Sequence, residues 1–141
     1  MGRDPDADHV VREFWRLMQA RDWEALRALL HPRVVLEWPA SGERFDGADA
    51  VVGVNREYPE GWSIDVVRVL AGADGASAVS EVEVPHGEAG VFAVTSWWQV
   101  DRGRIVAGRE YWVQCGGDPP PPWRSRFATA WSGRPTEGAL P

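Results

Sequence analysis

The residues best suited to chemistry lie in a predicted β-hairpin near the end of the sequence, at residues 96–112. Two runs rich in β-branched and aromatic side chains flank a tight-turn signal at residues 101–103. Side chains along a strand alternate between two faces, so Glu110 shares one face with Gly108 and Trp112. Because carboxylates are seldom fully buried without a partner, an acid on an inward face is a candidate general acid or base. We therefore predict Glu110 as the candidate catalytic residue.

Aromatic side chains are the most unusual feature of the composition, with nine tryptophans in 141 residues. Tryptophan supplies a large apolar area with one polar N–H, which suits a core, a ligand cavity or an interface. We predict a pocket for a small apolar ligand around Glu110. Its expected lining is Phe14, Trp15, Trp38, Tyr58, Trp62, Ser96, Trp98 and Trp112. A purely structural role is equally consistent for Glu110, with its carboxylate held by a tryptophan N–H, a tyrosine or Ser96.

Metal and cofactor sites are not expected in this sequence. The three histidines, His9, His31 and His86, are far apart and show none of the spacings that bind metals. Cys115 is the single cysteine, which excludes an internal disulfide and a cysteine-based zinc site. The glycines lack the strand and helix context of a phosphate-binding loop.

The charge and hydropathy patterns exclude two classes of partner. A net charge of −6 leaves no basic stripe to neutralise nucleic-acid phosphates. There is no long apolar run and no leader pattern, so we expect no membrane partner and a cytoplasmic location. All 15 basic residues are arginine, a usage that favours a high-GC bacterial genome.

Helical periodicity precedes β-type alternation along the chain, which predicts an α+β domain over residues 9–115. We expect three N-terminal helices covered by a curved, cone-shaped antiparallel sheet. The predicted helices span residues 9–20, 22–30 and 46–58, and the predicted strands span residues 33–38, 62–71, 76–84, 91–100 and 104–114. Residues 1–8 are expected to form a flexible arm. The Pro-rich segment at residues 116–141 is expected to pack on the domain through Trp123, Phe127 and Trp131.

The order of elements and four sequence segments resemble the nuclear transport factor 2-like superfamily, in particular its bacterial SnoaL-like branch. The segments are ARDWEAL at residues 20–26, HPRVVLEWP at 31–39, SGERFDG at 41–47 and the closing hairpin at 101–112. The resemblance covers residues 9–127 and implies the cone-shaped, cystatin-like fold. One scaffold of this kind hosts many chemistries, so the resemblance by itself leaves the reaction open.

Three catalytic patterns known from this superfamily can be compared with the chain. The positions that look equivalent to those of steroid isomerases are Phe14, Trp38 and Ser96, none of which can abstract a proton. SnoaL-type cyclases need only one acid in an aromatic cavity, and Glu110 fits that pattern.

The third pattern is that of limonene-epoxide-hydrolase-like enzymes, which use two carboxylates bridged by an arginine. Here the corresponding positions look like Val82, Val84 and Glu110, so that triad is broken. We predict isomerase-, cyclase- or hydrolase-type acid–base chemistry on an apolar ligand. The alternative is a non-catalytic binding or dimerisation module with a degenerate active site.

The opposite sheet face is expected to carry Trp97, Arg109 and Tyr111, and Glu81 and Glu83 as well. Such a mixture of aromatic and arginine side chains is typical of an interface, and relatives of this superfamily commonly dimerise through that face. We therefore expect a homodimer formed through the outer sheet face. A β-bulge in the middle strands would shift parity and turn Glu81 and Glu83 inward, which would favour a site with several carboxylates.

Overall fold

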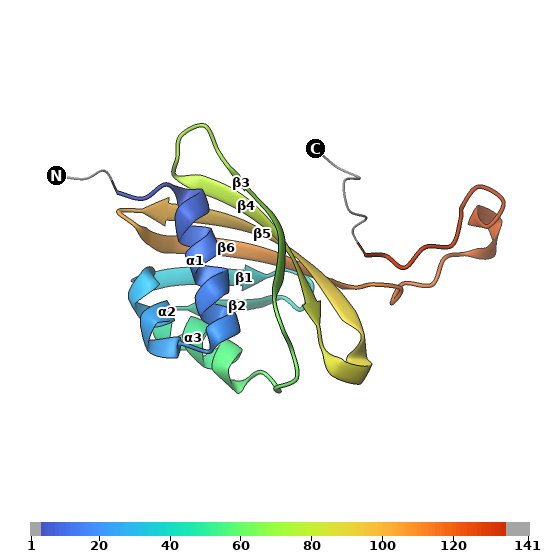
Figure 1. Cartoon of the computed structure of the whole chain (residues 1–141), viewed down its shortest axis with the longest axis horizontal. Coiled ribbons are helices and arrows are strands. Elements are labelled where there is room, and N and C mark those ends of the chain that lie inside the picture. Colours follow the sequence, from blue (N-terminus) through green and yellow to red (C-terminus); the bar gives the residue numbers. More distant parts are fainter. Residues whose placement is uncertain (1–3, 135–141) are drawn as a thin grey trace.

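The computed structural model describes residues 4–134 and has three helices packed on one face of a curved six-stranded sheet (Figure 1). The parts of the predicted arm and tail at residues 1–3 and 135–141 lie outside the described residues. The strand order is β2-β1-β6-β5-β4-β3. The helices are α1 (Ala7–Ala20), α2 (Trp23–Leu29) and α3 (Ala48–Glu57), and the strands are β1 (Leu30–Trp38), β2 (Glu43–Asp46), β3 (Asp65–Ala71), β4 (Ser77–Pro85), β5 (Val91–Asp101) and β6 (Arg104–Gln114). The predicted α+β fold class is confirmed.

The helices form where apolar side chains recur at helical spacing and end where the backbone or a cap interrupts them. Helix α1 starts after Asp6 and buries a stripe that includes Phe14 and Trp15 against the sheet. It ends at Arg21, whose left-handed backbone (φ 58°) turns the chain towards α2. The side chain of Asp22 caps α2 by accepting a hydrogen bond from the amide of Ala25 at 3.1 Å. None of the helices between residues 4 and 134 is long and apolar enough to span a membrane.

The sheet is mixed rather than antiparallel throughout, which corrects one part of the predicted architecture. Strand β1 runs parallel to β6, while every other neighbouring pair is antiparallel. The parallel pair is compatible with the chain path, because α3 and four strands intervene between β1 and β6. Strand β2 lies in a stretch between the predicted strand at residues 33–38 and the predicted helix at residues 46–58, and its four residues are too few to give a strand pattern.

The core lies between α1 and the sheet and contains one buried polar contact point. Trp15 of α1 and Trp98 of β5 both donate their indole N–H groups to the hydroxyl of Ser80 on β4, at 3.1 and 2.8 Å. All three side chains are almost fully buried, so these hydrogen bonds satisfy indoles that would otherwise lose water without compensation. The contact fixes the position of α1 on the sheet.

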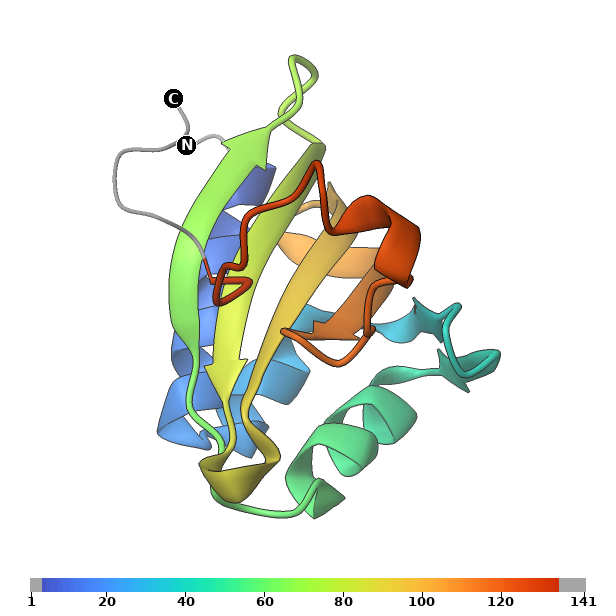
Figure 2. The same ribbon diagram turned by 90° about the vertical axis from the view of Figure 1, so that its right-hand side faces the viewer.

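The tail after β6 lies on the side of the sheet away from α1 (Figure 2). Its described part returns to the domain through Arg134, which forms a double hydrogen bond with Glu83 at 2.9 and 3.1 Å. Trp123, Phe127 and Trp131, by contrast, are about 70% exposed. The expectation that these rings hold the tail on its own domain is therefore not met in residues 116–134, where a charged pair supplies the attachment.

We predict opposite stability effects for two glycine-to-alanine substitutions. A Cβ at Gly108 would lie 2.6 Å from the Trp98 ring and 3.1 Å from Leu36, so Gly108→Ala overpacks the core. It should lower the free energy of unfolding by roughly 1–3 kcal/mol. The matched control is Gly53→Ala on α3, where the added Cβ meets no atom within 4 Å. This substitution should raise the free energy of unfolding by about 0.5–1 kcal/mol. Urea denaturation measures both, and a neutral Gly108→Ala would contradict the packing described here.

Candidate functional site

A cavity of about 260 Å³ opens at the end of the sheet where β1, β6 and β5 meet the end of α3. Half of its lining residues are aromatic, and one is a buried acid. The lining residues are Trp38, Ala40, Ser41, Glu43, Tyr58, Phe92, Glu110 and Trp112. Four of the residues predicted from the sequence, Trp38, Tyr58, Glu110 and Trp112, are among them.

Strand register brings two hydrogen-bond donors onto Glu110. On β5, Ser96 lies directly opposite Glu110 of β6, and its hydroxyl donates to one carboxylate oxygen at 2.7 Å. On β1, Trp38 donates its indole N–H to the other oxygen at 3.0 Å. Each oxygen of the buried carboxylate thus accepts one hydrogen bond, from a different neighbouring strand.

Burial decides the acidity of Glu110. Desolvation raises the pKa of its carboxyl above the ordinary glutamate value, and the hydrogen bonds from Ser96 and Trp38 only partly oppose that rise. The folded protein therefore binds this proton more tightly than the unfolded chain does. It follows that the stabilising contribution of Glu110 is complete below about pH 4.3 and is lost as the pH rises through the raised pKa.

Aromatic rings contact one another around the carboxylate and build the cavity wall. Trp112 stacks on Tyr58, with ring centroids 6.3 Å apart and planes 15° from parallel. It also makes edge contacts with Trp38 at 5.9 Å and Phe92 at 6.5 Å. Phe45 supports Trp38 from outside the lining at 4.7 Å. A planar apolar ligand would find faces and edges of rings on several sides.

The other predicted lining residues lie elsewhere. Phe14, Trp15 and Trp98 contact one another in the core, with ring centroids 4.8 to 6.1 Å apart, and do not line this cavity. Trp62 is buried beneath the Arg21 guanidinium, which lies 3.3 Å from its ring centroid. Ser96 is fully buried and acts on Glu110 rather than on the cavity surface. Inward orientation alone does not separate core from cavity, because helix placement decides which inward rings are covered.

Sequence reasoning missed four lining residues: Ala40, Ser41, Glu43 and Phe92. Phe92 shares its strand face with Ser96 and Trp98, so the alternation along β5 could have found it. Glu43 pairs with Trp38 across β1 and β2, and no pattern marked that short strand. Glu43 places a second carboxylate, which is exposed, on the lining of the cavity.

Metal binding finds no support in residues 4–134, where no group of three or more histidine, cysteine, aspartate or glutamate side chains could hold an ion. The lining of this cavity supplies carboxyl, hydroxyl and indole groups on an aromatic wall.

The family model of the SnoaL-like domain matches residues 11–108, and the chain belongs to this family. The resemblance predicted from the sequence is thus confirmed. No curated protein matches the chain.

Several solved structures share the fold over most of their length. A "putative ketosteroid isomerase" from Kribbella flavida is 28% identical, with 92% of this chain and 90% of that chain covered and a TM-score of 0.79. A steroid delta-isomerase from Pseudomonas aeruginosa is 27% identical, with coverages of 82% and 87% and a TM-score of 0.66. An epoxide hydrolase of M. tuberculosis, of the type that resembles limonene epoxide hydrolase, is 25% identical, with coverages of 77% and 84% and a TM-score of 0.63.

The structure shows what this chain has at the positions that look catalytic in steroid isomerases. Phe14 lies in the core, while Trp38 and Ser96 are the two donors to Glu110. The two valines at the positions expected for the hydrolase pair, Val82 and Val84, are buried. Glu110 alone retains an acid among the positions compared.

We predict that Trp38→Phe raises the pKa of Glu110 further. Phenylalanine keeps an aromatic ring but removes the indole N–H that stabilises the charged carboxylate. The matched control is Trp98→Phe, which makes the same change at an indole that donates to Ser80 instead. Carbon-13 NMR titration of the glutamate side-chain carboxyls reports the pKa directly. A pKa that is equal in the two variants would show that the Trp38 hydrogen bond has no effect on Glu110.

Proposed function

We propose that the cavity binds a small apolar, aromatic ligand and that Glu110 acts on it as a general acid or base. The observation that carries this proposal is a buried carboxyl, with a raised pKa, on the lining of an aromatic cavity. A pKa moved from the ordinary glutamate value towards neutrality suits proton transfer under physiological conditions. The SnoaL-like fold and its similarity to ketosteroid isomerases support the same class of reaction.

The volume of the cavity limits the size of the proposed ligand. Ligand sites commonly measure roughly 300–1,000 Å³, so a cavity of about 260 Å³ favours a ligand with one or two rings inside it. The stacked pair of Tyr58 and Trp112 favours a planar group. Glu110 would transfer a proton to or from a carbon or oxygen of that group. The exposed carboxylate of Glu43, also on the lining, would meet the more polar end of the ligand.

A second candidate function is a non-catalytic binding or dimerisation module. It is favoured by the hydrogen bonds that already occupy both oxygens of Glu110, and by the loss of the acids expected in steroid isomerases and epoxide hydrolases. In that role Glu110 would be a satisfied buried acid that holds β1, β5 and β6 together. Binding of an aromatic ligand without any Glu110-dependent proton transfer distinguishes this candidate from the enzyme.

We predict that Glu110→Gln abolishes proton transfer to and from a bicyclic carbon acid. The probe is 2-tetralone in D₂O, whose α-hydrogen exchange is followed by proton NMR, and loss of a general base should slow it at least about 100-fold. Binding of 2-naphthol, followed by tryptophan fluorescence, tests whether the cavity still accepts a two-ring ligand. Glu57→Gln, which removes an exposed acid at the end of α3 that is not a lining residue, is the control.

Equal exchange rates for the natural chain and Glu110→Gln would remove Glu110 from any catalytic role. If 2-naphthol binds to both while neither accelerates exchange, the non-catalytic module is the better description.

We also propose that the chain forms a homodimer through the outer sheet face. Trp97 and Tyr111 are exposed there beside Arg109, a combination enriched at protein interfaces. Sedimentation equilibrium over a range of concentrations should give twice the mass of the chain. Trp97→Arg should shift this equilibrium towards the monomer, and a full chain that is monomeric throughout would contradict the proposal.

A further inference from the structure

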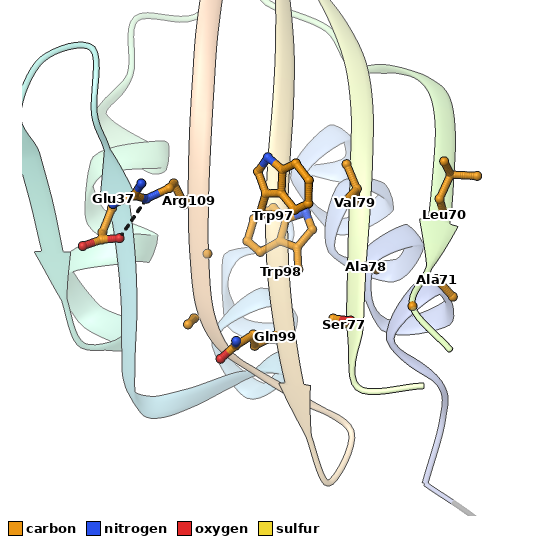
Figure 3. Close-up of a pocket in the computed structure, with 13 residues that line it drawn as sticks. Glu37, Leu70, Ala71, Ser77, Ala78, Val79, Trp97, Trp98, Gln99 and Arg109 are labelled. Atoms are coloured by element: carbon orange, nitrogen blue, oxygen red, sulfur yellow. Dashed lines mark hydrogen bonds and ion pairs between the residues drawn. The ribbon is translucent and has the colours of Figure 1, made fainter. Parts of the chain in front are cut away.

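The outer face of the sheet has a hollow of about 470 Å³ across β3, β4, β5 and β6 (Figure 3). Trp97 stands at its centre and Leu70 at its β3 edge, with side chains 57% and 60% exposed. The ion pair between Glu37 and Arg109, 3.2 Å apart, borders the other edge. An apolar hollow with a charged border is a surface suited to receiving another apolar group.

The tail carries apolar groups that its own domain does not cover. Trp123, Phe127 and Trp131 are 69%, 72% and 69% exposed, although they are among the largest apolar side chains in the sequence. The described tail is held only near its ends, where it leaves β6 and where Arg134 pairs with Glu83. Three exposed rings within nine residues expose far more apolar area than a scattered surface residue does.

The tail and the domain also carry net charges of opposite sign. Residues 116–134 contain three arginines and one aspartate, a net charge of +2. Residues 4–115 contain 11 arginines and 19 acidic residues, a net charge of −8. The tail is therefore complementary in charge to a second copy of the domain, and the natural partner for its aromatic rings is an apolar patch on an acidic protein.

We propose that the tail of one copy docks in the outer-face hollow of a second copy, so that the homodimer proposed above is closed by exchanged tails. In its own copy the tail returns to the sheet at Glu83, which lies four residues along β4 from Val79 in the hollow, a distance of about 13 Å. Between these attachments the three rings remain about 70% exposed. A partner with two-fold symmetry would present its hollow to each tail, and each contact would occur twice.

The length of the tail permits this exchange. Trp123 lies nine residues beyond Gln114, and the segment between them includes four consecutive prolines, so an extended chain of that length spans about 28 Å. Three strand spacings, from β6 to β3, measure only about 14 Å. Docking would bury the exposed area of the six rings of the two tails and an equal area of the surfaces that they cover. The interface would then measure roughly 1,300–2,100 Å² in total, the size of a stable protein interface.

Two variants test the exchange. The tail variant is the triple substitution W123A, F127A and W131A, and the face variant combines L70E with W97R. All five side chains are largely exposed, so neither variant should disturb folding, and circular dichroism verifies this. Each variant alone should dissociate at least tenfold more readily than the natural dimer in sedimentation equilibrium. The control S125A with T129A changes exposed tail residues without removing a ring and should leave the dimer intact.

Mixing the two variants distinguishes exchange from other arrangements. A mixed dimer has one intact contact, between the natural tail of the face variant and the natural face of the tail variant. Native mass spectrometry should therefore show mixed dimers in clear excess over either variant's own dimer. A tail that docks in its own copy would give no such excess and would overturn the proposal.

The same measurements separate this inference from the proposals on which it rests. A dimer that persists unchanged in the tail variant contradicts tail exchange but leaves the outer-face dimer standing. A monomeric natural chain contradicts both. Exchange of 2-tetralone hydrogens by the tail variant reports on Glu110 independently of either outcome.

Discussion

The register between β5 and β6 is the constraint on which the rest of the site depends. Pairing Ser96 with Glu110 sets an acid and a hydroxyl side by side on the covered face, and the parallel pairing of β1 with β6 adds the Trp38 indole. A slip of one residue would turn Glu110 towards the outer face and leave both donors without an acceptor. The cost of an unmet buried polar group is about 1–3 kcal/mol, so the hydrogen bonds also act against the slipped register.

Side chains alternate between the two faces of the sheet along each strand, and the two faces hold different kinds of polar contact. On the covered face, Ser80 pairs with the indoles of Trp15 and Trp98, while the buried indole N–H of Trp112 has no hydrogen-bond partner among the described residues. On the outer face the charged residues form pairs that remain partly exposed, including Arg68 with Glu81 and Arg109 with Glu37. A surface pair contributes little stability, which makes the outer face tolerant of exchanging one partner for another. This difference suits a fixed cavity on one side and an adaptable contact surface on the other.

Alternation predicted which residues point inward, and the helical spacing predicted three helices to within a few residues of their observed ends. Glu110 is buried, and Glu81 and Glu83 lie on the opposite face, because β4 has no bulge to shift its pairing with β5. The sequence could not separate cavity from core, since Phe14 and Trp98 are covered only through the position of α1. Nor could it predict the parallel pairing of β1 with β6, which joins segments distant in the chain, or the short β2 that carries Glu43, whose four residues are too few to give a pattern.

Comparison of Glu110 with the steroid isomerase pattern suggests how one family site could change its chemistry while keeping its place. The positions that look like the isomerase acids are Trp38 and Ser96, on β1 and β5, and here they are donors to a single carboxylate on the strand between them. Donors lower the pKa of a carboxyl and desolvation raises it, so the balance between them sets how readily Glu110 takes a proton. One carboxyl poised in this way can serve as base and then as acid in successive steps. In the proposed function a second acid is therefore unnecessary, provided that Glu110 returns the proton that it accepted to the same ligand.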